Sequence, residues 1–135
     1  MYYLVFNDNE RSLMVNALIV LRNRILTDGT HPGYADAASD AIRKLSSASE
    51  RKVKVNTEDT VSKQKRSVAG LEDYERGIIS AALDSKKKVL KSSPCICEII
   101  DELIARLENA PEKKSGITVN EKVPVKGRDS YAQAR

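Results

Sequence analysis

The sequence has no tryptophan and one phenylalanine, Phe6, and aromatic residues make up only 4% of its 135 residues. A core with so few rings has to be filled by aliphatic side chains and alanine, and alanine is the strongest helix former. Strand-rich folds draw more heavily on aromatic and β-branched residues. The shortage of aromatics therefore favours helices over a β-sandwich.

Histidine and cysteine are almost as scarce, because His31, Cys95 and Cys97 are the only ones. A disulfide framework needs more cysteines spread along the chain. One protomer also cannot assemble a four-ligand zinc site of the Cys and His type. We interpret both cysteines as small packing residues, with metal or redox chemistry as the alternative, and we expect no metal and no cofactor.

Long hydrophobic runs are absent as well. No apolar stretch approaches the roughly 18–20 residues that cross a membrane, and the N-terminus lacks the charged-then-apolar pattern of a signal peptide. We therefore expect a cytoplasmic protein with no membrane partner. The net charge of +4 fits an anionic partner, or no more than solubility.

The sequence does contain an internal repeat. Asp8-Asn9-Glu10-Arg11 matches Asp73-Tyr74-Glu75-Arg76 at a shift of 65 residues, with Asp8 and Asp73 as the expected N-caps. The apolar stripe of a first helix matches at the same shift, with Leu13, Met14, Ala17, Leu18 and Ile25 meeting Ile78, Ile79, Ala82, Leu83 and Leu90. At a shift of 62, a second helix matches, with Ala37, Ala38, Ala41, Ile42 and Leu45 meeting Ile99, Ile100, Leu103, Ile104 and Leu107, and Lys44 meeting Arg106.

Turns and short strands complete each copy. Gly29 and Pro32-Gly33 should end the first helix of copy one, and Ser93-Pro94 should begin the second helix of copy two. Alternating segments at 50–56 and 117–120 predict a strand after each helix pair, and Tyr2–Phe6 predicts one before the first.

These signals predict an α+β fold, mainly helical, made of tandem duplicated helix–turn–helix–strand units with a small antiparallel sheet. We expect a single domain over residues 1–135. It divides into unit 8–56, a polar and partly helical connector 57–72, unit 73–120 and a C-terminal arm 121–135. Pro and Gly favour an extended arm, and an unstructured terminus is the alternative.

The two first helices differ in polarity. Val15, Ile19, Val20 and Leu21 stand where the second copy has Ser80, Asp84, Ser85 and Lys86. A helix that is apolar almost all round has to be covered on more than one side. The first helix should thus be central in the domain or buried by another protomer, and we expect a homo-oligomer.

No catalytic constellation is recognisable, and we expect no enzymatic activity. His31 lies in a Gly/Pro-rich turn without a paired nucleophile, and no phosphate-binding loop motif occurs. The basic clusters are the only candidate chemistry: they either stabilise helix C-termini or form a phosphate patch. For the second case we predict ligand binding by Arg22, Asn23, Arg24, Lys87, Lys88, Arg128, Asp129 and Tyr131.

The Glu-Arg-x-Leu/Ile…Ala-Leu helix, the short turn, the acidic second helix and the lysine-rich strand occur at residues 7–56 and 72–120. This pattern resembles small counter-defence proteins of phages and mobile elements of Gram-positive bacteria, including nucleotide-sequestering sponges of the Thoeris anti-defence type. The resemblance implies an oligomer in a bacterial host cell that sequesters an anionic nucleotide-like signal without catalysis. The alternative is an anti-CRISPR-like accessory or inhibitor protein that binds protein or nucleic acid through basic helix faces.

Overall fold

A computed structural model describes residues 1–29, 32–56, 61–112 and 118–120. In chain order the elements are β1 (Tyr2–Phe6), α1 (Asp8–Asp28), α2 (Pro32–Ser46), β2 (Ser49–Asn56), β3 (Val61–Leu71), α3 (Asp73–Val89), α4 (Pro94–Glu108) and β4 (Thr118–Asn120). The predicted mainly helical α+β fold is confirmed. The order strand–helix–helix–strand occurs twice, in unit one (Tyr2–Asn56) and unit two (Val61–Asn120), although order alone does not establish a repeat.

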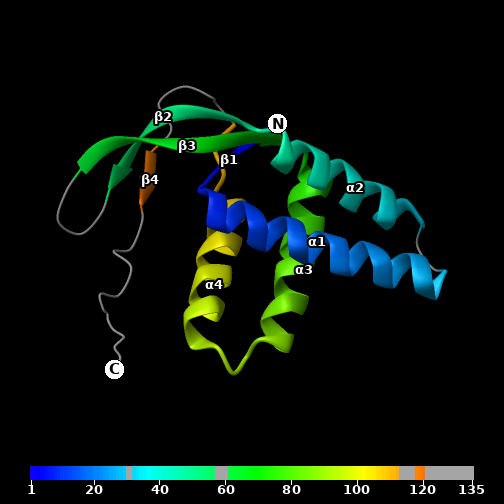
Figure 1. Cartoon of the computed structure of the whole chain (residues 1–135). Coiled ribbons are helices and arrows are strands. Elements are labelled where there is room, and N and C mark those ends of the chain that lie inside the picture. The colour runs from blue at the N-terminus through cyan, green and yellow to red at the C-terminus, as the bar shows by residue number, and fades with distance from the viewer. Residues whose placement is uncertain (30–31, 57–60, 113–117, 121–135) are drawn as a thin grey trace.

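The four strands form one sheet in the order β1-β3-β2-β4 (Figure 1). β3 pairs antiparallel with β1 on one side and with β2 on the other. The predicted antiparallel sheet is therefore right for three strands. The exception is β4, which pairs parallel with β2 through Thr118, Val119 and Asn120.

The helices pack against one side of the sheet near β1, and the β2–β3 hairpin reaches out past them (Figure 1). Leu4 and Phe6 of β1 and Ala69 and Leu71 of β3 share a buried core with all four helices. These side chains alternate with outward ones, as the two-residue period of a strand requires. The distal part of the hairpin therefore stands free of the helical core.

Both predicted N-caps are wrong by one residue. Asn7 caps α1: its Oδ1 accepts the Glu10 N–H at 2.8 Å, and Glu10 Oε1 accepts the Asn7 N–H at 2.9 Å. In α3 the cap residue is Glu72, whose N–H donates to Glu75 Oε1 at 2.7 Å. This reciprocal bonding needs a glutamate three residues after the cap, which moves Asp8 and Asp73 into the first turn.

The turns follow their Gly and Pro residues. Gly29 ends α1 with φ of 68°, a left-handed conformation that glycine adopts without the Cβ penalty. We expected Pro32 and Gly33 to extend this break, but they begin α2. Proline fits the first turn of a helix, where the N–H groups lack helical partners. Pro94 begins α4 as predicted, although the Ser93 side chain makes no capping hydrogen bond.

The expected polar connector 57–72 is mostly strand, which corrects its assignment as partly helical. Residues 61–71 form β3, the longest strand and the one that pairs on both sides. The side chains of residues 61–66 are alternately exposed and half-buried. No apolar face marks this half of the strand in the sequence. Strand pairing, not burial, accounts for the conformation of that half.

α1 packs against α2 and α3, whereas α3 packs against the other three helices, so the expectation of a central first helix is not established. Met14, Ala17 and Leu18 of α1 are buried. Val20 and Leu26 nevertheless stay exposed, so a homo-oligomer remains a prediction. None of the described helices is long and apolar enough to cross a membrane.

Candidate functional site

The first predicted group of ligand-binding residues lies on α1. Arg22 is half-buried, and its guanidinium donates to Ser39 Oγ of α2 at 3.5 Å, a weak contact. Asn23 and Arg24 are exposed. All three residues lie in the second half of α1, and none of them lines the pocket between α3 and α4 that is described below.

The second predicted group lies on α3 and is engaged within the fold. Lys87 Nζ is 2.7 Å from Asp101 Oδ1 of α4, and this hydrogen bond raises the pKa of the Lys87 ammonium above its usual range. Lys88 lies 3.5 Å from Asp84 on the same helix. These contacts fit the alternative interpretation, in which the lysines stabilise the C-terminal end of α3.

The structure does not bring the two groups together. The last turns of α1 and α3 point in different directions, one beside α2 and the other beside the start of α4 (Figure 1). Arg128, Asp129 and Tyr131 lie outside the described residues. The predicted eight-residue ligand site is therefore not assembled by the described part of the chain.

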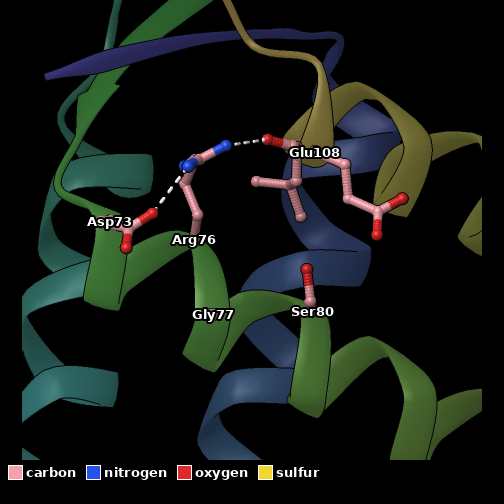
Figure 2. Close-up of a pocket in the computed structure, with 6 residues that line it drawn as sticks. Asp73, Arg76, Gly77, Ser80 and Glu108 are labelled. Carbon is pink, nitrogen blue, oxygen red and sulfur yellow. Dashed lines mark hydrogen bonds and ion pairs between the residues drawn. The ribbon is translucent and has the colours of Figure 1, made fainter.

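A pocket of about 340 Å³ lies between α3 and the end of α4 (Figure 2). Its cation is Arg76, which donates to the Leu107 carbonyl at 2.7 Å and to Asp73 Oδ1 at 2.6 Å. The same guanidinium lies 3.6 Å from the centroid of the Tyr2 ring. Arg76 is thus committed to holding β1, α3 and α4 together, and we interpret the pocket as structural.

The described residues also hold no group of three His, Cys, Asp or Glu side chains that could bind a metal ion. Cys95 is exposed and Cys97 is half-buried on α4. Cys97 Sγ lies 3.4 Å from the Leu90 carbonyl, a weak hydrogen bond across the α3–α4 turn. This position agrees with a packing role for Cys97.

Within the part of the chain that the structure describes, the β2–β3 hairpin carries lysines without ion-pair partners. Its register places Lys52 opposite Lys65 and Lys54 opposite Lys63. Directly opposed residues of an antiparallel pair point to the same side, so these four lysines share one face of the ribbon. All four are exposed. We call this surface the lysine face.

Two like-charged pairs in succession weaken the apo hairpin, because directly opposed like charges repel across the strands. Among the residues that the structure describes, none of the four lysines has an ion-pair partner. Residues 50–66 hold six basic and three acidic residues, so they carry most of the net charge of +4. An anion bound on this face would relieve the repulsion between the opposed lysines.

The plain alternative is protection of strand edges. Lysines on a free edge discourage pairing with other chains, and residues 61–66 of β3 pair with β2 alone. Edge protection does not require matched lysines on both strands, however.

The lysine face was not predicted, because its residues were divided between an expected strand and an expected connector. The signal was Lys52-Val53-Lys54 and Lys63-Gln64-Lys65 on either side of one polar turn.

No family model matches the chain, and no curated protein or solved structure matches it either.

Proposed function

We propose that the protein is a non-enzymatic nucleic-acid-binding protein that holds the phosphate backbone of a duplex with its lysine face. The observation that carries the proposal is the pair of opposed lysine pairs, Lys52–Lys65 and Lys54–Lys63. Ammonium groups that neutralise phosphates release condensed counterions, which drives binding without sequence specificity.

Single-stranded nucleic acid fits the same surface less well. Proteins that bind single strands stack bases on aromatic side chains. Neither β2 nor β3 contains an aromatic residue. The lysine face offers charge alone, and the proposal is therefore for duplex.

Fluorescence anisotropy with a labelled 20-base-pair duplex tests the proposal. Four lysine–phosphate contacts give a slope of about −3.6 for log K against log salt, so a fourfold rise in salt weakens binding roughly 100-fold. The ribbon variant, Lys52→Gln/Lys54→Gln/Lys63→Gln/Lys65→Gln, should bind the duplex weakly and with little dependence on salt. A single strand of the same sequence should bind more weakly than the duplex.

A matched control removes the same charge from helices. Arg24→Gln/Arg43→Gln/Lys88→Gln/Lys91→Gln changes four exposed cations, of which Arg43 and Lys88 make only exposed ion pairs. The control should bind duplex with an unchanged slope of log K against log salt. If it loses binding while the ribbon variant keeps it, the basic helix faces are the interface. Equal losses, or no binding by the parent protein, would also overturn the proposal.

The apo ribbon variant separates binding from edge protection. Relief of the opposed charges should raise its thermal midpoint slightly, since each like-charged pair costs about 0.2–1 kcal/mol. If the lysines serve only to block edge pairing, the variant aggregates instead and the parent protein does not bind duplex. Light scattering of the parent protein and the variant at equal concentration shows whether the variant aggregates.

Sequestration of a nucleotide-like signal by a phage-encoded oligomer remains a prediction, and the described residues add no site to it. Isothermal titration against cyclic nucleotides and ADP-ribose derivatives tests it. Binding that survives the ribbon variant would favour this function over duplex binding. The oligomer has its own test: Val20→Asp/Leu26→Asp should reduce the particle mass if these exposed side chains of α1 form the contact.

A further inference from the structure

The main hydrophobic core is made of positions that the two sequence shifts relate. A shift of 65 relates β1 and α1 to β3 and α3, and a shift of 62 relates α2 to α4. All sixteen buried residues of this core fall into eight equivalent pairs: Leu4/Ala69, Phe6/Leu71, Met14/Ile79, Ala17/Ala82, Leu18/Leu83, Ala38/Ile100, Ala41/Leu103 and Leu45/Leu107. The two units therefore bury the same face of each element.

The pairing of β1 with β3 is symmetric about the same shift. Leu4 pairs with Ala69, which is its own equivalent at a shift of 65. Exchange of the two units then turns the Tyr2–Leu71 pair into the Phe6–Ser67 pair, and both are present. Any antiparallel register keeps such an exchange, and this one centres it on two residues of the main core. The pairing therefore has a local two-fold axis between Leu4 and Ala69.

The buried ion pairs cross this axis. Glu10 of unit one lies 2.9 Å from Arg106 of unit two, and Glu75 of unit two lies 2.7 Å from Lys44 of unit one. Glu10 and Glu75 are equivalent, and so are Lys44 and Arg106. Each unit thus supplies a buried carboxylate to the other unit's cation.

Two further contacts obey the same exchange. Arg11 donates to Ser67 across the axis, while its equivalent, Arg76, stacks on Tyr2, the equivalent of Ser67. At the sheet edge, the Tyr3 N–H donates to the Pro111 carbonyl at 2.8 Å. The equivalent residues, Val68 and Ser49, are partners in the β2–β3 ladder.

From these contacts we infer that the chain is an intramolecular dimer: two strand–helix–helix units, β1-α1-α2 and β3-α3-α4, face each other across a two-fold axis through one self-complementary surface. The last strands depart from this symmetry, because β4 pairs with β2 and not with β1. The partner that this surface fits is a second copy of the unit, which the same chain supplies. A two-fold interface is isologous, so one favourable contact occurs twice. Joining both copies in one chain also removes most of the entropic cost of association.

Double-mutant cycles in urea test the inference on the full chain, with Glu10→Gln, Glu75→Gln, Lys44→Met and Arg106→Met. The crossed combinations Glu10/Arg106 and Glu75/Lys44 should couple by about tenfold in the unfolding equilibrium constant. The matched combinations within one unit, Glu10/Lys44 and Glu75/Arg106, should be additive to within about twofold. Coupling within the units, or its absence across them, would overturn the inference.

Hydrogen exchange on one variant gives the answer even if a doubly substituted chain fails to fold. Lys44→Met changes unit one but removes the partner of Glu75, which holds the Glu72 amide of unit two. The Glu72 amide should exchange faster, at least threefold, while the equivalent Asn7 amide keeps its rate. Faster exchange confined to unit one would contradict the crossed arrangement.

Discussion

The second helices of the two units occupy equivalent places with side chains of different size. Ala38 and Ala41 of α2 are the counterparts of Ile100 and Leu103 of α4, and all four are fully buried. Small side chains let helix axes approach closely. α2 accordingly packs against both α1 and α3, whereas α4 makes most of its helix contacts with α3.

The strands differ in the opposite sense. Leu4 and Phe6 of β1 face the core where β3 has Ala69 and Leu71. Unit one thus places its bulk in the strand and unit two in the helix. Cores tolerate such exchanges when the total volume is kept, and the comparison indicates that one framework is filled in two ways.

The distal part of the β2–β3 hairpin lies outside this framework. Residues 61–66 of β3 extend past β1 and pair with β2 alone. They contribute nothing to the sixteen-residue core. Val53 and Val55 of β2 are buried with Val5 and Val68 in a second, smaller cluster. The lysines of β2 alternate with these valines, and all four lysines add like charge without burial, which the proposed duplex binding accounts for.

Among these predictions, replacement of Leu103 should have the largest effect on stability. Leu103→Ala copies the residue of unit one into unit two without the compensating strand, and leaves a cavity beneath α4. We expect a loss of about 2–5 kcal/mol in the free energy of unfolding, measured in urea. Ile99→Ala, an exposed site on the same helix, should cost far less. Equal losses would mean that α4 is not packed as described.

The reverse exchange overfills unit one. Ala41→Leu places the side chain of Leu103 where α2 lies between α1 and α3, with no space for it. Overpacking of this kind costs about 1–3 kcal/mol. Adding Leu103→Ala to the same chain should not restore stability, because the cavity and the added bulk lie in different units. Urea denaturation of the single and double variants checks both statements.

The first helices end differently, and this gives a smaller effect. α1 ends at Gly29 with φ of 68°, while α3 ends at Leu90 with φ of −101°. Gly29→Ala should cost about 1–2 kcal/mol, the penalty of a left-handed conformation for an L-residue. Gly33→Ala, in the open first turn of α2, should instead be neutral or stabilise by up to about 1 kcal/mol. Thermal unfolding of both variants separates these signs.

Much of the framework could be predicted from the sequence. Apolar stripes at helical spacing identified α1 to α4, and their match at two shifts selected the residues that the core uses. Gly29 and Pro94 marked turns because their backbones restrict the helix. The outer half of β3 could not be found in this way, since Lys63, Gln64 and Lys65 show no apolar face.

The candidate site was predicted less well, for a geometric reason. Arg22–Arg24 and the lysines of α3 occupy similar places in the repeat, and we expected them to lie side by side. A two-fold axis brings equivalent residues together only near the axis, and it separates helix ends that lie far from it. The lysine face, in contrast, depends on the register of β2 with β3, which no local pattern reveals.

The finest difference between the units is the cation at each buried glutamate. Arg106 reaches Glu10, Glu102 and the Val5 carbonyl, whereas Lys44 reaches only Glu75 Oε1. Among the described atoms, Glu75 Oε2 is buried without a hydrogen-bond partner. A guanidinium presents a fork that fits both carboxylate oxygens.

Lys44→Arg should therefore make the two sites alike. A hydrogen bond to a charged group contributes about 1.5–3 kcal/mol when formed, and ordering the longer side chain offsets part of it, so we expect a net gain near 1 kcal/mol. Arg106→Lys is the matched reversal and should be destabilising, because one ammonium cannot span three acceptors. If Lys44→Arg lowers the thermal midpoint instead, Glu75 Oε2 has no space for a second donor and the two sites are equivalent in position alone.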